Sequence, residues 1–221
     1  MATRLSGTAA RDNMRDALKT AFTSVFDFKS IDGYKLYITD NIYIEVGEHG
    51  DLNVYKGNLS VCAIDFNWSG NYSWEVVKSA SGDVAFRVSE KDSALVDGQG
   101  LGVVIAKAKN VLTGADTYGV YVPINRTTQT VKYFITDDTS QLTETTGIYQ
   151  NGGSTSVSAY CIWNPAASIS SLISVCAVSS ACVCESLKIM QFGPREYYGE
   201  CLVNNKSYYS FGQVMMLDEE E

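Results

Sequence analysis

Apolar and polar residues alternate with a period of two along most of the chain after Ser30. The alternation is clearest in residues 34–39 (YKLYIT) and 42–46 (IYIEV), which flank the turn residues Asp40 and Asn41. Since successive side chains of a strand point to opposite faces, each segment predicts a strand with one buried face. The short turn between them predicts a β-hairpin.

Segments of strand length recur through the rest of the chain, separated by turns rich in Gly, Asn, Asp and Ser. They follow one another every eight to fifteen residues or so, roughly the rhythm of a sandwich or barrel and not of a βαβ sheet. The pattern predicts a mainly β protein with a β-sandwich or jelly-roll-like architecture. The predicted strands after the first hairpin are 52–56, 59–66, 72–78, 84–89, 101–108, 118–124, 131–136, 157–163, 187–192, 200–203, 207–211 and 213–217.

The N-terminal segment has a different period. Apolar residues recur every three or four positions over residues 8–28, as on one face of an amphipathic helix. Thr8 is the expected N-cap. The apolar face must be covered either by the sheet or by a neighbouring subunit, and its large members are Met14, Leu18, Phe22 and Val25.

The segment 166–184 contains nineteen residues without a charge. This length is sufficient to cross a bilayer, but six of these residues are serine and no basic residue follows, so we expect a buried element and no membrane segment. Asn164 and Pro165 favour a helix start, whereas the β-branched and Cys-rich composition favours strands. Periodicity leaves the choice between helix and strand open for residues 165–184.

These elements divide the chain into three parts. Residues 1–30 form the predicted N-terminal helix, and residues 31–150 form the predicted β-sandwich body. A long polar loop is expected near residues 137–156. The strands of residues 151–221 either complete the same domain or form a small appendage, and residues 218–221 (DEEE) are an acidic tail.

The composition suggests a protein that contacts other protein chains. Apolar residues make up 45% of the chain and charged residues only 19%, which suggests that partners cover part of the surface. Fourteen tyrosines suit both strands and interfaces. The net charge is −8, of which the acidic tail contributes four. A chain without a basic field is not expected to bind nucleic acid.

The sequence contains no recognisable catalytic or metal-binding set. Its N-terminus lacks the apolar segment of a secretory signal, so we expect the six cysteines to be free and buried. The pair Cys182 and Cys184 does not have the CxxC spacing of a zinc site. The single histidine, His49, lies in the Gly-rich turn 47–50. We therefore predict no enzyme activity, no catalytic residue, no metal and no cofactor, and a hydrolase would have to depend on His49.

An aromatic cluster in residues 66–74 (FNWSGNYSW) is the most distinctive candidate for ligand binding. Aromatic residues that alternate with small polar ones form sugar-stacking or protein-binding faces. On this interpretation Trp68, Tyr72 and Trp74 bind a carbohydrate or receptor. The alternative interpretation places Trp68 and Trp74 in the core of the sandwich.

Two parts of the chain resemble small virion-associated proteins that tailed phages and prophages encode. The first consists of residues 5–17 (LSGTAARDNMRDA) and 50–57 (GDLNVYKG), together with residues 85–88 and 96–98. The second is the ending 188–221, which is similar to the tails of other phage structural proteins. The similar positions cover about a third of the chain, and the hairpin 34–46 departs from the first pattern.

The resemblance implies a structural virion protein, at a head–tail or tail position, that is assembled in the cytoplasm of the bacterial host. It implies homo-oligomers and contacts with other virion proteins, and no active-site residues. The expected interface consists of Met14, Leu18, Phe22 and Val25 with the Tyr-rich strands. The alternative function is a tail-borne carbohydrate-binding or receptor-binding module that uses Trp68, Tyr72 and Trp74.

Overall fold

The computed structural model describes ten segments of the chain, which contain one helix and sixteen strands. The segments are residues 3–64, 71–90, 101–110, 112–123, 132–137, 172–177, 182–190, 197–203, 206–212 and 214–219. The N-terminal elements are β1 (Thr3–Ala10), α1 (Arg11–Val25), β2 (Ser30–Asp32), β3 (Lys35–Tyr37), β4 (Ile42–Val46), β5 (Leu52–Lys56) and β6 (Leu59–Ile64). They are followed by β7 (Asn71–Lys78), β8 (Val84–Glu90), β9 (Leu101–Asn110), β10 (Asp116–Pro123), β11 (Lys132–Thr136), β12 (Leu172–Ala177), β13 (Cys182–Met190), β14 (Tyr197–Val203), β15 (Lys206–Gly212) and β16 (Val214–Glu219).

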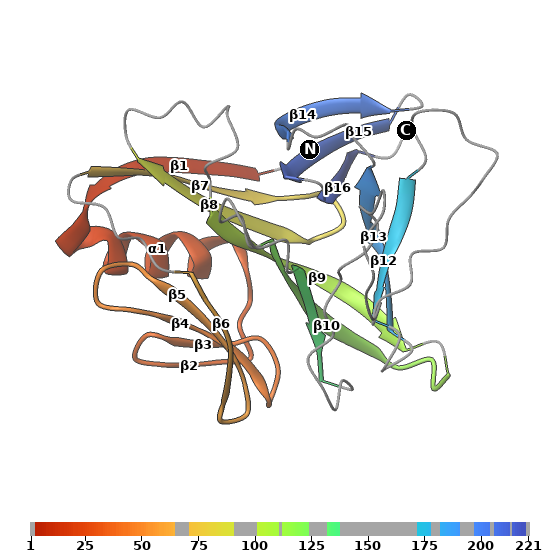
Figure 1. Ribbon diagram of the computed structural model, residues 1–221, viewed down its shortest axis with the longest axis horizontal. Helices are drawn as coiled ribbons and strands as arrows, with labels where there is room; N and C mark the ends of the chain where they lie inside the picture. The colour runs from red at the N-terminus through yellow and green to blue at the C-terminus, as the bar shows by residue number, and fades with distance from the viewer. Residues whose placement is uncertain are drawn as a thin grey trace, which may run out of the picture.

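The fold is mainly β and sandwich-like, with two antiparallel sheets and the helix near the N-terminus, as the alternation of the sequence predicts. Eight strands of an eleven-stranded sheet follow the order β1-β7-β8-β9-β13-β16-β15-β14. Its other three strands pair off this path, β10 with β9 and β11, and β12 with β13. A five-stranded sheet has the order β2-β3-β4-β5-β6. Figure 1 shows α1 between the five-stranded sheet and strands β1, β7 and β8 of the larger one.

The five-stranded sheet consists of consecutive hairpins, so its order follows the sequence. The predicted hairpin is confirmed, because β3 and β4 pair with Tyr37 opposite Tyr43. The alternate residues Ile42, Ile44 and Val46 are fully buried and face the helix. This sheet therefore has one face in the core and one face on the outside of the molecule, as the period of two indicates.

The helix begins later than the sequence predicts. Residues 3–10 form the edge strand β1, which pairs with β7 along its whole length, and α1 starts at Arg11. Ala10 stands at the N-cap position without a side-chain hydrogen bond, so the predicted cap at Thr8 is wrong. The small residues in 6–10 are compatible with both a helix and a strand, and their pairing with β7 makes this segment a strand.

The apolar face of α1 lies in the core of its own chain. Met14, Leu18 and Phe22 are completely buried, and Val25 is 5% exposed. The ring centroid of Phe22 is 4.7 Å from that of Phe86 on β8. The sequence left open whether the sheet or a neighbouring subunit covers this face of the helix. In the structure, the two sheets cover it. The prediction that these four side chains form a subunit interface is therefore wrong, because they are buried in the core of their own chain.

Polar contacts at the margin of the helix add to this packing. The Arg15 Nε donates a hydrogen bond to the Val46 carbonyl oxygen at 3.0 Å, and the Arg15 guanidinium lies over the Tyr34 ring. The Tyr34 hydroxyl donates to the Asp16 carboxylate at 2.7 Å, and this bond raises the pKa of Tyr34. These contacts connect α1 to the five-stranded sheet on the side where its residues are half-exposed.

The larger sheet is buried on both faces in its central part. Phe86 and Val103 face the helix, while Ala85 and Val104, the neighbouring residues on β8 and β9, are also buried. The C-terminal strands lie close to the N-terminal ones, because Tyr209 of β15 donates a hydrogen bond to the Glu75 carboxylate of β7 at 2.5 Å. Figure 1 shows β15 and β16 near the ends of β1 and β7.

The described part of residues 165–184 consists of strands, which answers the question that periodicity left open. Residues Leu172–Ala177 form β12, and β13 begins at Cys182. Because β13 pairs with β9, the C-terminal strands continue the larger sheet. The predicted strand 157–163 and the predicted loop up to residue 156 lie outside the described residues, apart from Asp137.

Gly50, in the turn between β4 and β5, lies directly against the helix. Its φ is +87°, and a Cβ at this position would be 2.3 Å from Met14 Cγ and 2.9 Å from Met14 Cβ. We expect Gly50→Ala to lower the free energy of unfolding by at least about 2 kcal/mol, because backbone strain and overpacking act together. Urea denaturation measures this loss.

Gly57→Ala is the matched control. Gly57 also has a positive φ, +57°, but a Cβ there meets no atom within 4 Å. We expect a loss of about 1 kcal/mol from the left-handed backbone alone. Equal losses for the two variants would show that contact with Met14 does not matter.

Candidate functional site

The described residues of the predicted aromatic ligand face do not form an exposed aromatic surface. Trp68 lies outside the described residues. Tyr72 and Trp74 lie on the side of β7 that faces α1, where Tyr72 is 1% exposed and Trp74 packs half-buried against the core. A Cβ at Gly7 would be 2.6 Å from the Trp74 ring, so β1 covers this ring closely. The ligand interpretation of Tyr72 is wrong, because this side chain lies in the core. Trp74 packs against the core with part of its side chain exposed.

His49 lies in the turn between β4 and β5, beside the start of α1. Its Nδ1 is 3.9 Å from Asp12 Oδ1, and Asp12 is almost fully exposed. Within the described residues, no group of three or more His, Cys, Asp or Glu side chains has an arrangement that would hold a metal ion. When the imidazole is protonated, its contact with Asp12 is a weak ion pair at the surface.

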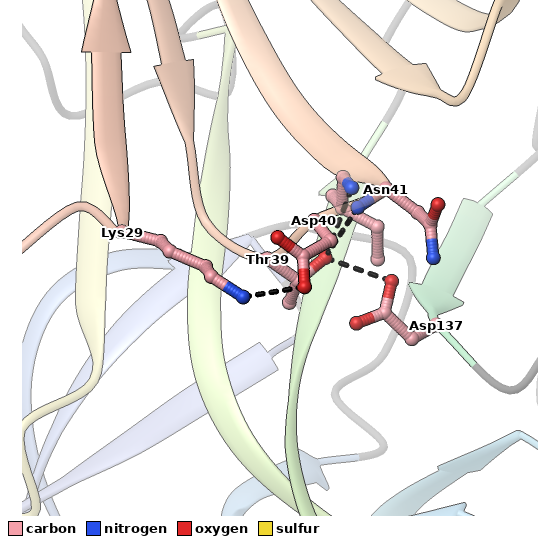
Figure 2. A network of polar contacts seen from close by, with 6 residues as sticks. Lys29, Thr39, Asp40, Asn41 and Asp137 are labelled. Carbon is pink, nitrogen blue, oxygen red and sulfur yellow. Dashed lines mark hydrogen bonds and ion pairs between the residues drawn. The ribbon is translucent and has the colours of Figure 1, made fainter.

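Residues distant in the sequence form a polar junction where the five-stranded sheet meets the end of β11 (Figure 2). Thr39, in the turn after β3, donates a hydrogen bond from its hydroxyl to Asp137 Oδ1 at 2.7 Å. The same hydroxyl oxygen accepts hydrogen bonds from the backbone N–H groups of Asn41 and Ile42. Thr39 is 9% exposed, so this hydroxyl makes three hydrogen bonds in a largely dry setting.

Two lysines strengthen the same junction. The Lys56 ammonium donates to the carbonyl oxygens of Thr136 and Asp137 at 2.7 and 2.9 Å. The Lys29 ammonium is paired with the Asp40 carboxylate, as Figure 2 shows. The turn between β3 and β4 is consequently held both to the start of β2 and to the end of β11. We call this set of contacts the junction.

A pocket of about 590 Å³ opens beside the junction, between the turn after β3 and strands β9 and β10. We call it the junction pocket. Ile38, Ala108 and Tyr118 contribute apolar surface to its wall. Its charged groups come from both sides, and they are Lys29, Asp40, Lys107, Lys109, Asp116 and Asp137.

A row of three tyrosines crosses the outer face of the five-stranded sheet. Tyr37, Tyr43 and Tyr55 lie opposite one another on β3, β4 and β5. Neighbouring ring centroids are 4.8 Å apart, and the rings of Tyr43 and Tyr55 are stacked within 8° of parallel. All three side chains are half-exposed. Partial burial is the main cause that raises the pKa of Tyr43.

Charged residues run beside this tyrosine row. Lys35 of β3 lies opposite Glu45 of β4, and the Lys35 Nζ is 5.7 Å from the centre of the Tyr43 ring. Glu45 in turn lies opposite Asn53 of β5. The outer face thus has a row of tyrosines, a residue type enriched at protein interfaces, next to a row with one positive and one negative charge.

Hairpin geometry explains how the sequence could have revealed the tyrosine row. The turns at Asp40 and at 47–50 each lie midway between two of the tyrosines, so pairing across the turns brings them together. The junction gives no such signal, because Thr39 and Asp137 are 98 residues apart.

Cys184 is the buried nucleophile of the described residues. Its side chain is fully buried, and burial raises the pKa of its thiol to about 12, while the negative charge of Asp83 acts in the same direction. Its Sγ lies 3.5 Å from Ser186 Oγ. A thiol that stays protonated is neither a good nucleophile nor a metal ligand, so Cys184 is a small core residue, as we expect for the cysteines of this chain.

Comparison with protein-family models, with curated proteins and with solved structures gave no match to this chain. In the part of the chain that the structure describes, no helix has both the length and the apolar character needed to span a bilayer.

Loss of the Thr39 hydroxyl should weaken the junction. Thr39→Val keeps the shape of the side chain but leaves one carboxylate oxygen and two backbone N–H groups without this partner. We expect the free energy of unfolding to fall by about 1–3 kcal/mol, as urea denaturation would measure. Thr23→Val, at an exposed position of α1, should change it by less than about 0.5 kcal/mol. An unchanged Thr39→Val protein would contradict the role of this hydroxyl.

The Cys184 thiol should resist alkylation in the folded protein. At pH 8.5 the thiol is protonated and covered, so peptide mapping after iodoacetamide treatment should find Cys184 unmodified until urea unfolds the chain. The ordinary thiol pKa of 9.0 is lower than the folded value. The unfolded state therefore loses the proton first, and this group lowers the stability as the pH rises above about 9. Equal labelling of the native and unfolded protein would refute this.

Proposed function

We propose that this chain is a structural subunit of a tailed phage or prophage particle, at a head–tail or tail position, and that it acts by assembling with other subunits. The resemblance of segments 5–17 and 50–57 to virion-associated proteins supports the type of particle. The half-exposed tyrosine row supports the mode of action, and it is the observation on which the proposal depends.

The proposal moves the interface from the helix to the five-stranded sheet. The apolar face of α1 is used within the chain, and the central part of the larger sheet is buried on both faces. The outer face of the five-stranded sheet remains as the described surface with clustered aromatic groups. Tyrosine and other aromatic residues are enriched at interfaces, because they bury apolar area and keep a polar tip.

The geometry of the tyrosine row favours a protein partner over a sugar. A sugar packs its apolar side on the open face of an aromatic ring. In this row the Tyr43 ring has a tyrosine at 4.8 Å on either side, so its faces are occupied. The ring edges and hydroxyl groups are what a partner meets, and hydroxyl groups suit the backbone and polar side chains of another protein.

The charges of this face suit a second copy of the same chain. Lys35 and Glu45 stand side by side next to the tyrosine row. A two-fold axis through the face would bring Lys35 of one copy near Glu45 of the other, and the two tyrosine rows together. Such an interface is self-complementary, as a two-fold homodimer requires.

Charge reversal on the outer face tests the assembly. We expect the protein to self-associate in analytical ultracentrifugation, and Lys35→Glu to raise the dissociation constant at least about tenfold, because it places like charges across the interface. The double variant Lys35→Glu/Glu45→Lys should restore association. Circular dichroism checks that each variant is folded.

Asp27→Lys is the control, since Asp27 is exposed after α1 and is not part of the tyrosine face. It should associate like the original protein. A monomer at all concentrations, or association that Lys35→Glu leaves unchanged, would refute the interface. Flanking genes that encode metabolic enzymes in place of head or tail proteins would refute the particle.

A further inference from the structure

The junction pocket is a second surface feature, separate from the tyrosine face. Its volume of about 590 Å³ lies within the range of small-molecule sites, about 300–1,000 Å³. Neither the fold nor the proposed assembly makes use of it. Its chemistry therefore has to be considered by itself.

The charges of the junction pocket balance. Three lysines and three aspartates line it, so their formal sum is zero (3 − 3). Lys29 and Asp40 already form an ion pair, and Thr39 occupies one oxygen of Asp137. An anion would meet the aspartates and a cation the lysines, each at an electrostatic cost. A ligand without net charge avoids both costs.

Donors and acceptors without a partner remain in the pocket. Among the described residues, the side chains of Lys107, Lys109 and Asp116 form no hydrogen bond or ion pair with the protein. All three side chains are exposed at the rim of the pocket. A ligand that both donates and accepts hydrogen bonds can use ammonium and carboxylate groups together. Neighbouring hydroxyl groups of a sugar have this property.

The apolar part of the wall completes the pattern of a sugar site. Tyr118 is half-exposed, and its ring is fixed by an edge contact with Phe26 at a centroid distance of 5.4 Å. Ala108 of β9 and Ile38, in the turn after β3, also line the pocket. Unlike the stacked rings of the tyrosine row, Tyr118 has one aromatic neighbour among the described residues. Apolar surface with a few polar groups is what a small-molecule site needs.

The two walls of the pocket are fixed before any ligand binds. The hydrogen bond from Thr39 to Asp137 connects the turn after β3 to the end of β11, and the two from Lys56 connect β5 to the same end of β11. A preformed site loses little conformational entropy on binding, which raises its affinity for a ligand that fits.

We infer that the junction pocket binds a small neutral polyhydroxylated ligand, a mono- or disaccharide. The hydroxyl groups would bind Lys107, Asp116 and Asp137, and the apolar side of the sugar ring would lie on Tyr118. The site differs from the aromatic cluster of residues 66–74 and does not depend on assembly.

Saturation-transfer NMR and calorimetry with the full chain test this inference. The probes are glucose, galactose, mannose, N-acetylglucosamine and maltose, with inorganic phosphate and free lysine as charged comparisons. We expect at least one sugar to bind with a dissociation constant of about 1 mM, and Asp116→Asn and Lys107→Gln each to weaken it about fivefold or more. Tyr118→Phe should retain binding, because the ring remains.

Lys35→Gln is the control variant, because Lys35 lies on the outer face of the five-stranded sheet and outside the pocket. It should bind the sugar as the original chain does. Asp116 and Lys107 are exposed and make no described side-chain contact, so their variants should fold. The inference is overturned if no sugar binds at about 10 mM, if the pocket variants bind equally well, or if phosphate or lysine binds in place of the sugars.

Discussion

The burial of one helix face between two sheets is the constraint on which the rest of this structure depends. Met14, Leu18 and Phe22 are completely enclosed by side chains from both sheets, including Phe86 of the larger one. Each buried side chain of this size contributes about 1.5–3 kcal/mol of hydrophobic free energy. Without α1, the inner face of the five-stranded sheet would be open to water. The helix therefore joins the two sheets around one hydrophobic core.

The position of the helix determines which surfaces are left for other molecules. Because α1 uses its apolar face internally, any assembly has to depend on a different surface. The outer face of the five-stranded sheet offers the tyrosine row and a pair of opposite charges. The arrangement also brings the turn after β3 against the end of β11, which creates the junction and its pocket. Both candidate surfaces are thus consequences of the same packing.

The two surfaces differ in what they present to a ligand. In the tyrosine row the rings cover one another, so the surface is amphipathic and rather flat. In the junction pocket, separate charged side chains surround a single accessible ring, Tyr118. The first composition suits another protein chain, and the second suits a small polar molecule. Under the two proposals, assembly and ligand binding would use separate surfaces.

The amino-acid sequence by itself determined the local features of the protein. Alternation and turn residues placed the hairpin of β3 and β4 and most later strands, since side-chain period and turn chemistry depend only on near neighbours. The pairing register of β3, β4 and β5 also brings the three tyrosines of the row together, which the alternation alone did not indicate. The amphipathic face of α1 was visible too, although its start was not, because residues 6–10 fit a strand as well as a helix.

Only the tertiary structure decided what covers each face and which distant segments meet. It placed the helix face in the chain's own core, turned Tyr72 inward and paired β13 with β9. It also brought Asp137 to Thr39 across 98 residues. The physical reason is that an apolar stripe indicates only that one face of an element is buried. The hydrophobic effect is non-directional, so it does not specify which element covers that face. The partner is chosen by how all the elements pack together, which no local pattern contains.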